Sequence, residues 1–541
     1  MIMTSPRIIT LLLFTLVVLS TIAGPAVAAD KLSRPNIVVI LADDLGYSDL
    51  GCYGGEINTP NIDGLAEQGV RFRQFYNNAR CCPSRASILT GRYPAQVGVA
   101  AMIDGYAKWI RDAANLPSYD DHLSKETPTV AELLRDAGYR TMMSGKWHMG
   151  DRPAEWPMAR GFDRSFALIP GAMNYYGGET TGPRANMALD DKKFEPPHDG
   201  FFSTDAFTDR AIEFLKESKQ HDQPFFLYLP YNAPHWPLQA PPEDVAKYDG
   251  KYDKGWQMTR RGRRRRMDRL GVVERKMLMA SMDRGEVRPW DQLPPEKRDE
   301  WARRMEIYAA QVTRMDDNIG RVLAELDAMG VADNTLVIFL SDNGGAAEDP
   351  HRGQADAELG SRDSFWGYAH PWASVSNTPW RRHKVTMYEG GVSTPAVVRW
   401  PAAQPGAARG SFVDGPALLI DLVPTFLQLA DAKPTQQQQE QLEGRNIAPM
   451  FLGESMAADR TLCWEHEGNR AILKGTWKLV ELAKSPNGWE LYDLAADRAE
   501  QHNLALEQPE VVRDLASDYN AWAKRCGVLP WAEIQANRPQ Q

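Results

Sequence analysis

The chain has 541 residues, which is long enough for a large hydrophobic core and for more than one structural unit. Its formal net charge of −9 gives no reason to expect nucleic-acid binding. The five cysteines are an odd number, so at least one of them stays outside any intrachain disulfide and a framework of bridges is not the main source of stability.

The first 28 residues are predicted to be a signal peptide. Arg7 supplies positive charge, residues 8–24 are apolar, and Ala26–Ala28 is typical of a cleavage site. A membrane anchor is the alternative, but the stretch is short for a span of about 20 residues and contains hydroxyl side chains. No later segment has the composition of a membrane span. We therefore expect a secreted or periplasmic protein without a stable membrane span.

Residues 33–455 alternate short apolar runs with helical patterns, which predicts one large catalytic domain. The runs have the length of buried strands and occupy residues 36–41, 139–143, 224–229, 335–340 and 395–399. The helical patterns occupy residues 130–137, 205–218, 301–329 and 421–430. Thr127-Pro128 is expected to begin the first of these helices, and Gly138 to end it. This alternation favours an α/β fold, with a large mostly parallel sheet flanked by helices.

The pattern changes after residue 455, which predicts a smaller C-terminal subdomain over residues 456–541. Three runs at residues 470–473, 477–481 and 489–492 resemble an antiparallel meander with turns at 474–475 and 487–488. A helix is expected at residues 509–525, and residues 436–439 are expected to form a polar loop. The arginine-rich run at residues 260–266 is either a patch for a polyanion or a solvated loop. We favour the solvated loop because no aromatic residues interleave with the arginines.

Polar residues follow four of the predicted strands in chain order. They are Asp43 and Asp44, then Lys146 and His148, then His235, and finally Asp342 and Asn343. In open parallel sheets, sites form at the carboxyl ends of the strands, so we expect these side chains to gather at one edge. A single Asp-Asp pair is more often a turn or a helix cap, but here two such pairs each follow a strand. Their hard oxygen donors suit Ca²⁺ or Mg²⁺.

Cys81 and Cys82 precede Pro83, which is expected at the first position of a short helix. Cys81 then lies at a helix N-terminus, where free N–H groups favour an anion, and Arg85 can bind a sulfate or phosphate with two hydrogen bonds. Buried or disulfide-linked thiols are an alternative interpretation. A thiol nucleophile is another, and it requires an activating base.

The run Cys81-x-Pro83-Ser84-Arg85, continuing to Leu89-Thr90-Gly91, resembles the signature of the type I sulfatases, which belong to the alkaline phosphatase superfamily. The resemblance extends over nearly the whole mature chain. It includes residues 35–46, 145–150, 341–345, 377–384 and 490–494. It implies an arylsulfatase-like enzyme that hydrolyses sulfate esters of a small molecule or a glycan. In that family a dedicated maturation enzyme oxidises the first cysteine of the motif to formylglycine (3-oxoalanine).

The same resemblance implies a role for each matching position. Asp43, Asp44, Asp342 and Asn343 match the ligands of a divalent ion, usually calcium, and Cys81 matches the formylglycine that also touches the metal. The residues around the sulfate are matched by Arg85, Lys146, His148, His235 and Lys384. A hydrated aldehyde then attacks sulfur, His235 with Lys384 protonates the departing alcohol, and His148 takes the proton from the second hydroxyl.

Two other functions remain open at the level of the sequence. Related formylglycine enzymes on the same fold hydrolyse phosphonate monoesters and phosphodiesters, and a binding protein with a decayed site is a third class. The pocket is expected to be shaped by loops at residues 103–123 and 153–197. Trp147 and Trp236 adjoin site residues, and we favour burial over substrate stacking for both.

Overall fold

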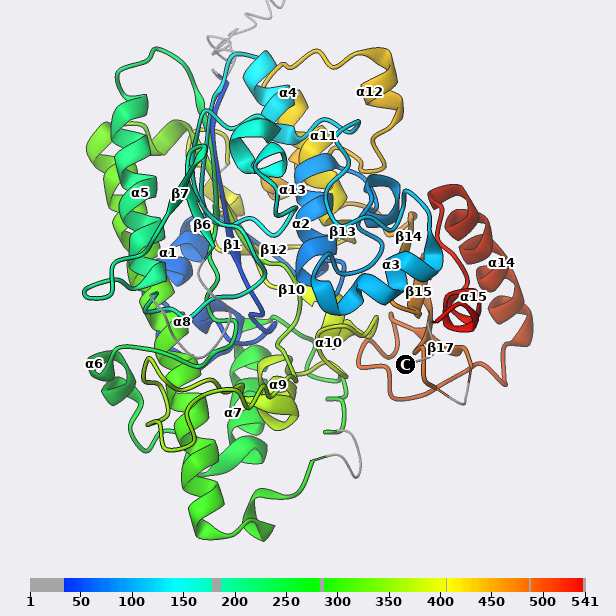
Figure 1. Cartoon of the computed structure of the whole chain (residues 1–541). Helices are drawn as coiled ribbons and strands as arrows, with labels where there is room; N and C mark the ends of the chain where they lie inside the picture. The colour runs from blue at the N-terminus through cyan, green and yellow to red at the C-terminus, as the bar shows by residue number, and fades with distance from the viewer. Residues whose placement is uncertain (1–33, 178–185, 283–286, 405, 486–487, 539–541) are drawn as a thin grey trace, which may run out of the picture. The chain divides into compact units, whose positions relative to one another are not determined.

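The computed structural model describes residues 34–177, 186–282, 287–404, 406–485 and 488–538 (Figure 1). The predicted signal peptide at residues 1–28 lies outside the described residues, as does Asn487 of one predicted turn. Among the helices within these ranges, none has the length and apolar character that crossing a bilayer requires.

A ten-stranded sheet organises the larger part of the chain, and its centre is parallel. The five central strands lie side by side in the order β9 (Thr335–Ser341), β1 (Asn36–Ala42), β8 (Phe225–Pro230), β4 (Arg140–Lys146) and β5 (Arg164–Leu168). Shorter strands, most of them paired antiparallel, extend the sheet on both sides of this parallel centre. Beyond β9 lie β11 (Ala396–Arg399), β2 (Val70–Phe72) and β12 (Ser411–Val413), and beyond β5 lie β6 (Met187–Leu189) and β7 (Lys192–Phe194). The predicted α/β fold is confirmed, although the sheet as a whole is mixed.

Both faces of this sheet are buried, which explains the unbroken apolar runs. Along β1, residues 37, 39 and 41 belong to one hydrophobic cluster and residues 38, 40 and 42 to another. Helices α1 (Pro60–Gln68), α5 (Ser203–Ser218) and α8 (Pro295–Met329) pack on the second cluster (Figure 1). The first cluster is covered by α2 (Cys81–Thr90), α4 (Val130–Asp136) and α11 (Leu422–Leu429). Each fully buried aliphatic side chain contributes about 1.5–3 kcal/mol.

The predicted smaller antiparallel sheet is also present. Its strands are β14 (Thr461–His466), β15 (Asn469–Lys474), β16 (Trp477–Glu481) and β17 (Glu490–Asp493), followed by α14 (Pro509–Cys526) and α15 (Trp531–Ala536). Its buried side chains join the cluster that contains α2, so the core continues from one sheet to the other. Three short strands form a third sheet, β3 (Phe75–Tyr76), β10 (Ser393–Thr394) and β13 (Ala417–Leu418). The remaining helices include α3 (Lys108–Ala114), α6 (Pro242–Val245), α9 (Ala369–Ser376), α10 (Glu389–Val392) and α13 (Ala448–Phe451).

Three local predictions are wrong. Residues 436–439 form a helix, α12 (Gln436–Glu440), because the Thr435 hydroxyl accepts from the Gln438 N–H and caps it. The helix predicted to begin at residues 127–128 begins after Thr129, whose hydroxyl accepts from the Glu132 N–H. Pro83 is the third residue of α2, not the first. For the helices that begin after Thr129 and Thr435, a hydroxyl cap accounts for the boundary.

The arginine-rich run is not a solvated loop but part of a helix, α7 (Gly255–Leu270). Arg263 is fully buried, where it pairs with Asp49 and, at 2.7 Å, with Glu56. Arg266 contacts the same Glu56 carboxylate at 2.8 Å. One face of this helix therefore fixes the segment that follows β1.

Candidate active site

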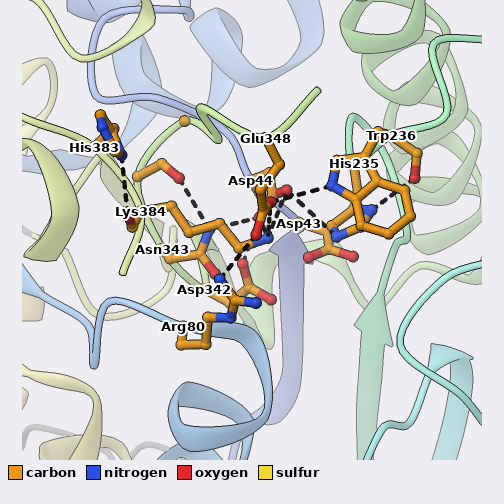
Figure 2. A network of polar contacts seen from close by, with 12 residues as sticks. Asp43, Asp44, Arg80, His235, Trp236, Asp342, Asn343, Glu348, His383 and Lys384 are labelled. Carbon is orange, nitrogen blue, oxygen red and sulfur yellow. Dashed lines mark hydrogen bonds and ion pairs between the residues drawn. The ribbon is translucent and has the colours of Figure 1, made fainter. Parts of the chain in front are cut away.

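The central strands deliver predicted site residues to one place, and Figure 2 shows Asp43, Asp44, His235, Asp342, Asn343 and Lys384 gathered there. Asp43 and Asp44 follow β1, Lys146 ends β4, His235 follows β8, and Asp342 follows β9. All ten predicted positions are buried: Asp43, Asp44, Cys81, Arg85, Lys146, His148, His235, Asp342, Asn343 and Lys384. Asp44 and His148 have positive φ angles of 67° and 55°, a region that non-glycine residues rarely adopt. Such backbone conformations collect at functional sites, because the surrounding structure must impose them.

Oxygen atoms converge where strands β1 and β9 end. The Asn343 amide donates to Asp44 Oδ1 at 2.6 Å, and the Asp44 N–H donates to Asp342 Oδ1 at 3.3 Å. Within the described part of the chain, Asp43 Oδ1 and Asn343 Oδ1 are buried and accept no hydrogen bond. Buried acceptor oxygens normally accept a hydrogen bond. Two that do not, in a cluster of three carboxylates and one amide, fit a bound cation. Oxygen donors of this kind suit Ca²⁺ or Mg²⁺.

Three basic side chains face the three carboxylates. Lys146 Nζ lies 2.7 Å from Asp43 Oδ2, and Lys384 Nζ lies 2.9 Å from Asp44 Oδ2. Arg85 donates to Asp342 Oδ2 through Nε and Nη2, at 3.1 and 2.9 Å. These charges balance one another, so a divalent cation would leave an excess of positive charge. That excess complements an anionic ester in a site of low dielectric constant.

Of the two adjacent cysteines, only Cys81 faces a cavity. It is the first residue of α2, whereas Cys82 is fully buried with its sulfur 3.2 Å from Met102 Sδ. Burial by itself would raise the pKa of the Cys81 thiol, but Lys146, His148 and Lys384 outweigh it and leave a pKa of about 5. Burial holds the pKa of Cys82 well above its usual value. All five cysteines are free thiols.

The two site histidines differ in charge near neutral pH, because the pKa of His148 is raised and that of His235 is lowered. Burial lowers the pKa of His148, but Asp104, 3.2 Å from Nε2, and Cys81 raise it to about 9. Burial lowers the pKa of His235 to about 4 against the opposing charge of Asp44. The Nδ1 atom of His235 lies 2.7 Å from the Trp236 carbonyl, so Nδ1 carries the proton.

A cavity of about 600 Å³ opens onto this set of residues. Its wall includes Cys81, His148, His235, Lys384 and Trp236. The volume lies within the range of about 300–1,000 Å³ that is usual for ligand sites. Cys81, two histidines and Lys384 therefore surround one cavity, and Lys384 links it to the acidic oxygen cluster.

Residues 35–432 match the family model described as Sulfatase, which is more than half of the chain. The chain belongs to the sulfatase family. Residues 380–521 of this sulfatase also match the model described as N-sulphoglucosamine sulphohydrolase, C-terminal. The enzyme is therefore a sulfuric ester hydrolase.

Individual relatives agree with the family over nearly their whole lengths. The sulfatase is 35% identical to an uncharacterized sulfatase of Schizosaccharomyces pombe, over 92% of this chain and 94% of that protein. It is 32% identical to the arylsulfatase of Klebsiella aerogenes, over 84% and 97% of the two chains. The crystal structure of Ps i-CgsB in complex with k-i-k-neocarrahexaose is 26% identical, with a TM-score of 0.68 over 93% and 96% of the chains. The fold is that of the alkaline phosphatase-like sulfatases.

Sequence reasoning missed two acidic residues of the sulfatase site. Glu348 lies 3.2 Å from Lys384 Nζ and accepts from Trp236 Nε1 at 3.1 Å. Asp104 is the partner of His148, and its only signal in the sequence is a place in one of the loops predicted to shape the pocket. Of the two tryptophans, Trp147 is buried as expected, whereas Trp236 is half-buried in the cavity wall.

Proposed function

We propose that this sulfatase hydrolyses sulfate esters through a formylglycine that a maturation enzyme makes from Cys81. The observation that carries the proposal is the position of Cys81, which begins α2 and lines the cavity together with His148, His235 and Lys384. Cys82 has no such access, since its sulfur is buried against Met102. The maturation enzyme would therefore oxidise the side chain of Cys81, and not that of Cys82, to the aldehyde.

We further propose that Ca²⁺ is held by Asp43, Asp44, Asp342 and Asn343, together with residue 81. The free acceptor oxygens of Asp43 and Asn343 support this assignment, and oxygen ligands alone also fit Mg²⁺. When bound, the ion and the hydrated aldehyde supply a Lewis acid and an oxygen nucleophile. Arg85, Lys146 and Lys384 hold the sulfate oxygens and stabilise the charge that develops on them, which is usually the largest catalytic contribution.

Two histidines move the protons. His235, with Lys384, protonates the oxygen of the departing alcohol, because the bound sulfate adds negative charge beside His235 and raises its low pKa. His148 takes a proton from the side chain of residue 81. Conversion of Cys81 removes the thiolate that helps to raise the pKa of His148, so more of this histidine is unprotonated near neutral pH and available as a base.

The proposed leaving group is a sugar hydroxyl, so that the substrate is a sulfated glycan. Ps i-CgsB, which is bound to k-i-k-neocarrahexaose, supports an oligosaccharide substrate, while the Klebsiella arylsulfatase supports aryl sulfates as usable probes. We also propose export to the periplasm or the medium, with removal of residues 1–28. N-terminal sequencing of the exported protein should then begin at Ala29.

Mass spectrometry of the tryptic peptide Cys81–Arg85 tests the mechanism. We expect one thiol replaced by an aldehyde and one intact cysteine, with activity lost in Cys81→Ala and largely kept in Cys82→Ala. Two unmodified cysteines in active enzyme would overturn the proposal. Nitrophenyl sulfate should be hydrolysed faster than nitrophenyl phosphodiesters, and the reverse order would favour the phosphodiesterase alternative.

A further inference from the structure

A second cavity, of about 670 Å³, shares part of its wall with the active-site cavity. Lys384 and Glu348 line both cavities, and their side chains form an ion pair 3.2 Å long. Trp236 lines the active-site cavity, whereas His383 lines the second one. Figure 2 shows the Lys384 and Glu348 side chains between these two rings. The second cavity therefore begins at the wall where the site for the sulfate ester ends.

Two half-buried tryptophans form an aromatic wall of this second cavity. Trp109 of α3 and Trp531 of α15 have ring centroids 5.9 Å apart and planes inclined by 60°. Trp531 lies against the turn between β14 and β15, where a Cβ on Gly468 would be 2.4 Å from the indole ring. That glycine has a φ of +86°, so the turn both needs a glycine and leaves room for the ring. A rigid aromatic face of this kind binds the apolar face of a sugar ring at a small cost in side-chain entropy.

Beyond the Lys384–Glu348 pair, the second cavity is lined by two basic side chains and one acidic side chain, Glu467, so its wall carries an excess of positive charge. Lys484 and Arg538 are both exposed and line the cavity. Over the residues that the structure describes, neither has an ion pair, and the Arg538 guanidinium lies 4.7 Å from the centre of the Trp109 ring. By contrast, Lys474 at the end of β15 is paired with Asp518 at 2.7 Å. A guanidinium stacked on an aromatic ring is already oriented for a planar or tetrahedral anion.

We propose that this second cavity, the Trp109 subsite, binds the sugar ring next to the one that carries the scissile sulfate. The Trp109 subsite consists of Trp109, Trp531, Lys484 and Arg538. The tryptophans take the sugar ring, and the two basic residues bind a second sulfate group on it. This inference rests on the proposed function, and it narrows the substrate class to sugar chains with sulfate on adjacent rings. A small aryl sulfate fits within the active-site cavity and leaves the second cavity unused.

Competition against nitrophenyl sulfate hydrolysis tests the subsite. The competitors are sulfated tetrasaccharides of galactan, galactosaminoglycan and glucosaminoglycan type, each with its monosulfated monosaccharide as reference. We expect at least one tetrasaccharide to inhibit with a Ki about tenfold below that of its monosaccharide. Lys484→Ala should raise that Ki about tenfold, because a charge-assisted contact to sulfate is lost. Both enzymes should have the same kcat/KM for nitrophenyl sulfate.

Further variants separate binding of the sugar ring from binding of the second sulfate group. Trp109→Ala should weaken inhibition by tetrasaccharides with one or several sulfates, whereas Lys484→Ala should affect only those with sulfate on adjacent rings. Lys108→Ala, on the same helix but outside the cavity, is the control and should change nothing. Tetrasaccharides that inhibit no better than monosaccharides, or an unchanged Ki in Lys484→Ala, would overturn the subsite. Failure of the native enzyme to hydrolyse nitrophenyl sulfate would instead contradict the proposed function.

Discussion

Two clusters of buried charge in this sulfatase are built in different ways. In the active site, Asp43 and Asn343 each keep a buried oxygen that accepts no hydrogen bond within the described residues. In the second cluster, Lys478 of β16 lies 2.9 Å from Glu389 and 2.8 Å from Glu500, and all three residues are fully buried. Arg498 contacts Glu389 at 2.8 Å. Glu500 Oε1 also accepts no hydrogen bond, but Lys478 Nζ lies 2.8 Å from it, whereas Asp43 Oδ1 lies 3.8 Å from Arg85 Nη2. The spare oxygens of the active site are thus only loosely paired, whereas each charge of the Lys478 cluster closely contacts an opposite charge.

The Lys478 cluster holds the segment that carries Lys384. The Glu389 N–H donates to Glu500 at 2.8 Å, and Arg381 contacts Glu490 of β17 at 3.0 Å, so both ends of residues 381–389 are fixed to the small sheet. Between them, Val385 has a φ of 77°, a strained angle for a β-branched residue. We therefore propose that the loosely paired acceptors of the active site bind a ligand, whereas the matched charges hold the backbone.

Removal of the metal should have the largest effect. We expect a chelator to lower kcat/KM for nitrophenyl sulfate by about 10³-fold or more, and added Ca²⁺ to restore it, because we propose that the oxygen cluster holds a catalytic cation. Ca²⁺ should also raise the melting temperature, since it binds only the folded state.

Asn343→Ala tests whether the cation binds at the oxygen cluster. It removes one of the spare oxygens, so the Ca²⁺-dependent rise in melting temperature should shrink along with activity. Calorimetry with and without Ca²⁺ measures the change. An unchanged rise in the variant would show that the cation binds elsewhere.

Lys478→Met should have the second largest effect, and it should act on stability. The substitution leaves Glu389 and Glu500 buried without their shared cation, which costs about 3–5 kcal/mol of the free energy of unfolding. Urea denaturation measures the loss. Lys474→Ala on β15 removes an exposed ion pair of the same sheet and should cost less than about 1 kcal/mol. Equal losses of unfolding free energy in the two variants would show that the buried Lys478 cluster stabilises the fold no more than an exposed ion pair does.

The smallest expected effect is a pH dependence of stability. Burial raises the pKa of Glu500 from 4.5 to about 7, against the opposing charge of Lys478. Between these values the folded state binds more protons than the unfolded state, so this contribution is full below pH 4.5 and is lost as the pH rises through 7. Glu500→Gln cannot ionise and should show a shallower decline from pH 5 to pH 8, by about 1–3 kcal/mol. Parallel declines in denaturant titrations would contradict the assignment to Glu500.

The sequence by itself determined the parallel strands and the residues that follow them. Strands covered on both faces require unbroken apolar runs, and the ends of parallel strands meet at one edge, so Asp43, Lys146, His235 and Asp342 were predictable from local pattern. The resemblance of Cys81-x-Pro83-Ser84-Arg85 to the sulfatase signature distinguished Cys81 from Cys82, and the fold then placed Cys81 at the cavity.

The tertiary structure alone decided which charges meet. Glu348 forms an ion pair with Lys384, and Lys478 lies 89 residues beyond its partner Glu389, so no short-range pattern in the sequence predicts either pair. The arginine-rich run is a further example, because the local sequence does not distinguish a buried arginine from a solvated one until the partner is known. For Arg263 that partner is Glu56, 207 residues earlier in the chain. Local sequence specifies burial through periodicity, but the partner of a buried charge is specified only when distant segments fold together.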